Sequence, residues 1–298
     1  MKHIGIITKP AKHEALVVLR ELIPWLKWHG YDKIYLDKDA AAVLSSESAI
    51  SPAFSPVFSI KGYEKEDIAA LSQLIIVLGG DGTMLSVARL TAGLQTPILG
   101  INLGSLGFIT EIHRHEIFDA LLLVLSDQCP IEERVMLEAY VKRQGELVTK
   151  YVALNDVVIN KGALARIFDT ETLIDGRYVT TFKADGLIVA TPTGSTAYSL
   201  SAGGPILYPT LRCMLITPIC SHTLTNRPIV IEDSMSIEIV IKSESEDIYL
   251  TVDGQIGRNL CCEDIVEVKK APFVARLYMP YTRDYFQVLR EKLKWGER

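Results

Sequence analysis

The sequence predicts a Rossmann-like α/β domain, then an all-β domain and a final helix that packs back on the first domain. Over about the first 125 residues, strand and helix patterns alternate, as they do in α/β layers. From about Ile131 the spacing changes to short runs of alternating apolar residues, which is typical of antiparallel sheets. The chain has 298 residues, 48% of them hydrophobic, so it is long enough for about two domains.

The first elements of the α/β part follow from their apolar spacing. Strands are predicted at Ile4–Ile7 and Lys33–Leu36. Between them, Glu14–Trp28 carries leucines and an isoleucine at helical intervals, and Pro24 is expected to kink this helix. Residues 45–63 are rich in serine and proline, so this stretch is expected to be a loop.

The remaining α/β elements repeat the alternation. Leu74–Leu78 is an unbroken apolar run, which predicts a parallel strand buried on both faces. Helices are predicted at Thr83–Ala92 and His115–Leu125, with a strand at Pro97–Ile101 between them. Right-handed crossovers bring the ends of these strands, and with them Asp81, to one edge of the sheet.

Apolar residues alternate with polar ones in the second part of the chain. The predicted strands occupy residues 137–142, 147–153, 157–159, 167–174, 177–182, 186–190, 229–232, 236–241, 248–252, 265–269 and 274–279. Asp175 and Gly176 separate two of these runs, which favours a tight hairpin. The last element, Arg283–Leu293, is helical in spacing, and its apolar face is expected to be buried on the α/β layer. The predicted domains are residues 1–128 with 281–298, and residues 129–280.

Composition and charge narrow the class of protein. With 36 acidic and 31 basic residues, the net charge is −5, so no general nucleic-acid surface is expected. The N-terminal apolar stretch is too short for a signal peptide, and no run reaches the length of a membrane span. The five cysteines are an odd number without CxxC spacing, which favours reduced, buried thiols, with Cys261 and Cys262 adjacent. We therefore expect a cytoplasmic protein that binds neither nucleic acid nor membrane.

The most informative stretch is residues 79–83, Gly-Gly-Asp-Gly-Thr, directly after the apolar run 74–78. Glycines at the end of a strand let backbone N–H groups approach a phosphate closely. Asp81 is the only charged side chain at this turn, and a carboxylate beside phosphates either binds Mg²⁺ or takes a proton from an attacking hydroxyl. The alternative is that Asp81 only caps the following helix.

A second unusual stretch lies in the β-rich half. Thr191–Pro205 concentrates hydroxyls, glycines and alanines after a predicted strand. Hydroxyl groups can donate to and accept from a ligand, small residues leave room for a flat ring, and Tyr198 can stack on it. A short helix capped by serine or threonine is the simpler interpretation, although capping alone does not require so many small residues.

These stretches together resemble the NAD kinase family, in its bacterial ATP-NAD kinase form. The matching segments are residues 79–83, 102–108, 154–156, 184–205, 227–229 and 253–255. They stand in the family's order and cover nearly the whole chain. The first segment also resembles diacylglycerol-type lipid kinases and phosphofructokinases, whereas Thr191–Pro205 is more specific, and together they favour a catalytic role for Asp81.

The resemblance implies a β-sandwich-like second domain, an active site between the two domains, and the transfer of phosphate from ATP to the adenosine 2′-hydroxyl of NAD. It implies a divalent metal ion, usually Mg²⁺, and a homodimer or homotetramer in which some NAD contacts cross a subunit boundary. Asp81 would be the general base, since a secondary hydroxyl needs one at neutral pH, and Gly82 would contact the dinucleotide. No metal ligands are assigned; His113 and His115 could bind metal, but a surface helix start is favoured.

The remaining site residues also follow from the resemblance. Asn155 and Asp156 match the family's Asn-Glu pair, in which the amide reads adenine and the acid accepts from ribose hydroxyls. Asp156 is one methylene shorter than the family's glutamate. The alternative is that the two residues form an ordinary turn. Ala197 would lie against adenine and Tyr198 beside the ribose. The other predicted substrate contacts are Phe108, Arg166, Lys183, Asp185, Thr196, Ser199, Leu200, Ser201 and Gln255. Arg166 and Lys183 would lie near the phosphates, or be solvated surface cations; Gln255 alone would suggest only a hairpin turn.

Three alternatives lead to different classes of function. A lipid kinase or a sugar kinase would share the 79–83 turn but leave Thr191–Pro205 without a role. A non-catalytic NAD(P)-binding regulator would be expected to lack the acid at position 81, where this chain has Asp81.

Overall fold

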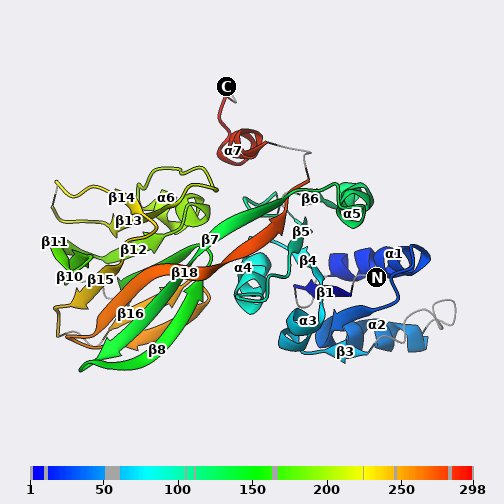
Figure 1. Ribbon diagram of the computed structural model, residues 1–298, viewed down its shortest axis with the longest axis horizontal. Helices are drawn as coiled ribbons and strands as arrows, with labels where there is room; N and C mark the ends of the chain where they lie inside the picture. The colour runs from blue at the N-terminus through cyan, green and yellow to red at the C-terminus, as the bar shows by residue number, and fades with distance from the viewer. Residues whose placement is uncertain are drawn as a thin grey trace. The chain divides into compact units, whose positions relative to one another are not determined.

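The structure is a computed structural model, shown in Figure 1. It describes residues 3–9, 13–50, 61–104, 106–110, 112–162, 167–223, 225–244, 247–280 and 284–296. The chain forms two compact units. One joins Met1–Glu133 to Ala275–Arg298, and the other comprises Arg134–Val274.

A parallel sheet forms the centre of the first unit. Its strand order is β5-β4-β1-β2-β3, with β6 beside β5, and all of these pairings are parallel. The strands are β1 Ile4–Thr8, β2 Ile34–Asp37, β3 Gly62–Tyr63, β4 Leu74–Gly79, β5 Ile98–Asn102 and β6 Ile112–His113. Strand β4 is buried along its whole length, as its apolar run predicted. The strand order reverses between β1 and β4, and open α/β sheets bind ligands beyond the carboxyl ends of strands at such a point.

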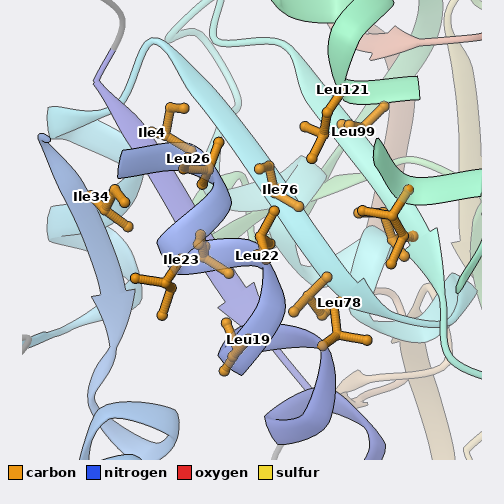
Figure 2. Packing of buried hydrophobic residues seen from close by; sticks show 14 of the residues in the cluster. Ile4, Leu19, Leu22, Ile23, Leu26, Ile34, Ile76, Leu78, Leu99 and Leu121 are labelled. Atoms are coloured by element: carbon orange, nitrogen blue, oxygen red, sulfur yellow. The ribbon is translucent and has the colours of Figure 1, made fainter. Parts of the chain in front are cut away.

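Helices cover both faces of this sheet. They are α1 His13–Trp28, α2 Lys38–Ile50, α3 Lys65–Leu71, α4 Asp81–Leu90 and α5 Ile117–Leu125, the last preceded by the 3₁₀ turn η2 Arg114–Glu116. Figure 2 shows Leu22 and Leu26 of α1 packed with Ile4 and Ile76 of the sheet, all fully buried. On the opposite face, a Cβ added at Gly100 would lie 2.9 Å from the Met84 sulfur of α4.

The predicted loop at residues 45–63 is wrong at both of its ends. Residues 45–50 belong to α2, and residues 62–63 form β3, while 51–60 lie outside the described residues. Tertiary packing explains the helix, because Ala40, Ala41 and Leu44 are buried in the core of the first unit. Helix α3, at residues 65–71, was also not predicted.

The second unit consists of two antiparallel sheets. The first contains β11-β10-β15-β18, with β7 beside β18 and β8 beside β7. These strands are β7 Ile131–Arg143, β8 Glu146–Ala153, β10 Phe168–Ile174, β11 Arg177–Ala184, β15 Ile237–Ile241 and β18 Ile265–Tyr278. Asp175 and Gly176, both at positive φ, form the predicted tight hairpin between β10 and β11. Strand β18 unites the two predicted runs at 265–269 and 274–279.

The second sheet has the order β14-β13-β12-β9-β16-β17. Its strands are β9 Asp156–Lys161, β12 Gly186–Ala190, β13 Cys213–Ile219, β14 Ile229–Glu232, β16 Ile248–Val252 and β17 Ile256–Leu260. Alternate residues of both sheets, such as Phe168 and Ile239 from one and Ile159 and Val189 from the other, share one buried core. The predicted fold class, α/β plus a β-sandwich-like domain, is confirmed.

The outer face of this second sheet is covered too. Leu207 packs there with Ile188 and Leu215 in a smaller buried cluster. The covering stretch includes the 3₁₀ turn η3 Thr193–Thr196 and the short helix α6 Tyr198–Ser201. Because β13 is buried on both faces, its sequence shows no alternation, and neither it nor the short β17 was predicted.

The chain ends with helix α7, Tyr285–Leu293, which belongs to the first unit as predicted. Val288 and Leu289 on this helix are buried. No helix in the described parts of the chain combines the length and apolar character that crossing a bilayer requires.

Candidate functional site

Asp81 is placed by the turn that joins β4 to α4. Gly79 ends the strand, Gly80 caps the helix in an extended conformation, and Asp81 is the first helical residue. A Cβ on Gly79 would lie 2.5 Å from the Thr83 hydroxyl oxygen, so this position has room only for glycine. The positive end of a helix dipole therefore coincides with the aspartate.

The Asp81 carboxylate accepts four hydrogen bonds from one loop. Its Oδ1 accepts from the backbone N–H groups of Ile109 (3.2 Å) and Thr110 (3.0 Å), and from the Thr110 hydroxyl (2.9 Å). Among the described residues, its Oδ2 accepts from one group, the backbone N–H of Phe108 (2.8 Å). Each carboxylate oxygen offers about two acceptor positions. The three donors on Oδ1 therefore fill that oxygen, while the single donor on Oδ2 leaves one of its positions open among the described residues.

The sheet register brings this loop to Asp81. Gly79 pairs with Asn102 in the adjacent strand β5, so the loops that follow β4 and β5 leave the sheet side by side. The Asn102 side chain then donates to the Thr110 hydroxyl (3.1 Å) and accepts from Gly104 N–H (2.7 Å). A Cβ on Gly107 would collide with Asp81 Oδ1. Asn102, Gly107 and Thr110 were not predicted as site residues, although two of them lie within the motif at 102–108.

Phe108 also meets the C-terminal helix. The Lys292 ammonium group of α7 lies 5.7 Å from the centre of the Phe108 ring, within the range of a cation–π contact. Phe108 is half-buried, and its backbone N–H holds Asp81. The final helix thus contacts the loop that orients the carboxylate.

In the second unit, most hydroxyls of the segment at 191–205 serve the fold. Thr191 Oγ1 donates to the Leu154 carbonyl (2.6 Å). Ser195 Oγ donates to the Pro192 carbonyl (2.7 Å) and accepts from Leu207 N–H. Ser199 Oγ is fully buried and lies 2.9 Å from Thr217 Oγ1 of β13.

The same segment leaves other side chains accessible. Tyr198 is 43% exposed, Ser201 is exposed, and Thr196, Ala197 and Leu200 are half-buried. The segment thus presents one aromatic ring on a framework in which Thr191, Ser195 and Ser199 are internally bonded, whereas the buried Thr193 hydroxyl has no partner among the described residues. The predicted short helix is present as α6, but the expected serine or threonine cap is wrong, because the N-cap residue is Ala197 and no described side chain caps the helix.

Asn155 and Asp156 are held beside this segment. The Thr191 N–H donates to the Asn155 carbonyl (2.8 Å), and Gly194 packs so closely that a Cβ there would lie 2.5 Å from the Asn155 carbonyl carbon. Asn155 is buried, and its side-chain Oδ1 has no hydrogen-bond partner among the described residues. An unsatisfied buried acceptor is costly, so this oxygen is a strong candidate for a ligand contact.

Asp253 holds the same turn from the β16–β17 hairpin. Its carboxylate accepts from the backbone N–H groups of Leu154 (3.2 Å), Asn155 (2.8 Å) and Asp156 (3.2 Å). Asp253 was part of a motif but was not predicted as a functional residue. Only the fold brings it to residues about one hundred positions away.

The Asp156 carboxyl is buried, and no cation of the described residues shifts its pKa. Burial first, and the negative charge of Asp253 second, raise the pKa of Asp156 from 3.8 to about 7. The folded protein therefore holds this proton more tightly than the unfolded chain. Asp156 destabilises the fold increasingly as pH rises from about 4 to about 7, and the penalty is constant above that.

Replacing Asp156 by Asn should remove this pH-dependent penalty. Over the interval from 3.8 to about 7, the penalty reaches about 4 kcal/mol at about 1.36 kcal/mol per pH unit. The variant should therefore resemble the natural protein in stability near pH 4.5 and exceed it by a few kcal/mol at pH 8. Urea unfolding of both proteins across this range measures the difference. A stability difference that does not vary with pH would contradict the assignment.

The other predicted contacts of the second unit are more exposed. Lys183 is paired with Asp169 across the β10–β11 ladder at 3.4 Å and is largely exposed. Asp185 is half-buried directly before β12, and Gln255 lies exposed in the β16–β17 turn. Arg166 lies outside the described residues. Binding roles for these four stay predictions.

Metal-binding groups do not gather in the described residues. No three side chains of His, Cys, Asp or Glu in those ranges are placed to share a metal ion. His113 and His115 stack with ring centres 5.6 Å apart, and the His113 N–H donates to Glu116 (2.8 Å), which fits the expected helix start before α5.

The fold and the site together define a class of protein. A glycine-flanked carboxylate at the switch point of a parallel sheet is typical of α/β proteins that handle phosphorylated ligands. The ATP-NAD kinase N-terminal domain family matches residues 4–129, and the ATP-NAD kinase C-terminal domain family matches residues 154–279. The chain belongs to the NAD kinase family.

Full-length relatives and solved structures agree with this assignment. The chain is 50% identical to the NAD kinase of Geobacter sulfurreducens and 47% identical to that of Syntrophotalea carbinolica, each over 100% of both chains. It resembles the crystal structure of yeast NADH kinase complexed with NADH, at a TM-score of 0.90 and 28% identity, covering 100% of this chain and 89% of the other. An NAD kinase from Archaeoglobus fulgidus in complex with ATP shares the fold, at a TM-score of 0.73 and 22% identity over 98% of each chain.

Proposed function

We propose that the protein is an NAD kinase, which transfers the γ-phosphoryl group of ATP to the adenosine 2′-hydroxyl of NAD and forms NADP. The observation that carries the proposal is the Asp81 carboxylate. Four hydrogen bonds fix it, and the described residues leave one acceptor position open on Oδ2. Family membership and the buried Asn155–Asp156 turn support NAD as the acceptor.

Asp81 Oδ2 is the atom that takes the proton. As the 2′-oxygen attacks the γ-phosphorus, its O–H bond breaks and the proton passes to Oδ2. The bond between the γ-phosphorus and the bridging oxygen then breaks, and ADP leaves. The three donors on Oδ1 hold the carboxylate in orientation throughout, which is the arrangement that positioning catalysis requires.

The N-terminus of α4 favours the binding of phosphate groups. Gly80 and Gly82 flank Asp81 without side chains, so an anionic group can approach the backbone there. The helix dipole adds partial positive charge at the same point. A transferring phosphoryl group is stabilised mainly by such fixed positive charge.

The second unit recognises the dinucleotide. Asn155 Oδ1, which has no partner among the described residues, can accept from the adenine amino group. The ionised Asp156 carboxylate can accept from ribose hydroxyls. The exposed Tyr198 ring can stack beside the nucleoside. Burial removes water from the Asp156 carboxylate, and bound ribose hydroxyls replace that water. Their hydrogen bonds favour the ionised form of Asp156.

ATP is the proposed donor, together with a divalent metal ion such as Mg²⁺. Mg²⁺ commonly needs only one or two carboxylates beside substrate phosphates, which suits a chain whose described residues form no larger cluster of metal ligands. When bound with ATP, the ion would offset phosphate charge. We also propose a cytoplasmic homo-oligomer, from the family resemblance alone.

An acceptor assay tests the proposed function. The purified protein is incubated with ATP and Mg²⁺, and with NAD, a hexose or a diacylglycerol as acceptor. We expect NADP with NAD and no phosphorylated sugar or lipid. Phosphorylation of the sugar or lipid without NADP would instead identify a kinase that shares only the turn at 79–83. Absence of all three products would favour a binding protein without catalysis.

A further inference from the structure

The Asp253 carboxylate is a buried anion surrounded by backbone donors. It lies at the first position of the turn after β16, at φ +49°, and is only 7% exposed. It accepts hydrogen bonds from the backbone N–H groups of three consecutive residues, Leu154, Asn155 and Asp156. In return, the Asp253 N–H donates to the Asp156 carbonyl (3.0 Å).

This arrangement fixes the direction of two side chains. When three successive N–H groups point at one carboxylate, the backbone dihedral angles between them are restricted. The side chains of Asn155 and Asp156 must then leave the backbone in set directions. No neutral side chain offers as many acceptor positions as a carboxylate, so an aspartate suits this place.

We propose that Asp253 is a positioning residue for NAD: it fixes Asn155 and Asp156 through the backbone and acts by its charge on the Asp156 carboxyl. The proposal rests on the proposed function, since it assigns Asp253 to the NAD-recognition part of that site. It differs from a plain turn-forming role because the charge on Asp253 has a consequence at a neighbouring group.

The charge effect has a defined source. Burial first, and the Asp253 charge second, favour the protonated form of Asp156 and raise its pKa to about 7. The residues paired with β9 at this point are uncharged: Ala190 of β12 lies opposite Asp156, and Val252 of β16 lies opposite Val157. Because NAD hydroxyls bind the ionised carboxylate, NAD binding releases a proton near pH 7. The affinity for NAD therefore increases as pH rises through about 7.

The test compares Asp253→Asn and Asp253→Glu with the natural protein. Titration calorimetry measures the Kd for NAD from pH 5.5 to pH 8.5 without ATP. In Asp253→Asn, one oxygen still accepts N–H bonds but the charge is lost, so we expect roughly tenfold weaker binding at pH 8. The midpoint of the pH dependence should fall by roughly one pH unit. Asp253→Glu keeps the charge but displaces it, so affinity should fall while the midpoint stays near 7.

Asp264→Asn is the matched control. Asp264 is another buried turn aspartate of the second unit, which accepts from the Cys261 N–H (2.8 Å) and pairs with Arg143. Its loss should lower the melting temperature without changing either the Kd for NAD or its pH midpoint. Equal effects of the Asp253 and Asp264 substitutions on NAD binding would reduce Asp253 to a structural role and overturn the proposal.

Two further outcomes separate this inference from the proposed function. If the natural protein forms NADP while Asp253→Asn binds NAD with unchanged affinity and midpoint, only the role of Asp253 fails. If the natural protein binds NAD with the expected midpoint but forms no NADP, only the proposed catalysis fails. If neither Asp253 variant folds, the number of protons released on NAD binding is measured instead, by calorimetry of the natural protein in buffers of different ionisation enthalpy. Proton release at pH 7 that Asp156→Asn abolishes would show that Asp156 is the group that NAD ionises, as the proposal requires, and no release overturns the proposal.

Discussion

Replacing Asp81 by Asn is expected to lower kcat for NADP formation by about 10²–10⁴-fold. The asparagine oxygen can still accept from Ile109 and Thr110, so the loop should remain in place. Its amide nitrogen, however, would stand where Oδ2 stands and cannot take the proton of the 2′-hydroxyl. The KM values for ATP and NAD should change far less than kcat, because the lost interaction belongs to the transition state.

Steady-state kinetics with thermal melting checks this expectation. Asp67→Asn is the matched control, because Asp67 is an exposed aspartate in the first turn of α3 in the same unit. The control should retain full activity and melt with the natural protein. Asp81→Asn should melt somewhat lower, because the Phe108 N–H loses its acceptor on Oδ2. A kcat for Asp81→Asn within threefold of the natural value would refute the general-base mechanism while leaving the family assignment intact.

Gly194→Ala is expected to damage both stability and NAD binding. The added Cβ would meet the backbone of Asn155, lying 2.5 Å from its carbonyl carbon and 2.7 Å from its Cα. Backbone atoms cannot turn aside as a flexible side chain can, so the segment at 191–205 and the Asn155–Asp156 turn must separate. Overpacking of this kind costs about 3 kcal/mol. A displacement of about 1 Å at a binding group can weaken function about 10²-fold.

Gly257→Ala provides the control for this substitution. Gly257 lies in β17 of the same unit, and an added Cβ would meet only the Leu250 carbonyl, at an ordinary 3.8 Å. We expect the control to keep its melting temperature and its Kd for NAD. If Gly194→Ala binds NAD as tightly as the control does, the contact between the two segments does not position NAD.

Much of the fold could be predicted because its apolar pattern is local. The buried run in β4, the alternation in β10 and β11, and the Asp175-Gly176 hairpin each carry their own signal over a few residues. The errors lie where burial comes from distant parts of the chain. Helix α2 continues through a serine-rich stretch, since its first turns pack into the core. Strand β13 shows no alternation, since Leu207 and its neighbours cover its outer face.

The chemistry of the candidate site was predictable in part, because residue types limit what a side chain can do. Asp81 between glycines indicated phosphoryl transfer, and the density of small and hydroxyl residues at 191–205 indicated a second site. We expected those hydroxyls to bind a ligand, but the side chains of Thr191, Ser195 and Ser199 make hydrogen bonds within the protein. The roles of the predicted contact residues stay predictions until the variants are measured.

By itself, the sequence determined the order of elements, the class of each half and the acid of the first turn. These features depend on residue chemistry and on spacing within about ten positions. Tertiary structure alone decided which groups hold the functional carboxylates. Thr110 reaches Asp81 across 29 positions, and Asp253 reaches Asn155 across 98. Hydrogen bonds act between atoms about 3 Å apart and are indifferent to separation along the chain, so only the folded backbone determines which donor meets which acceptor.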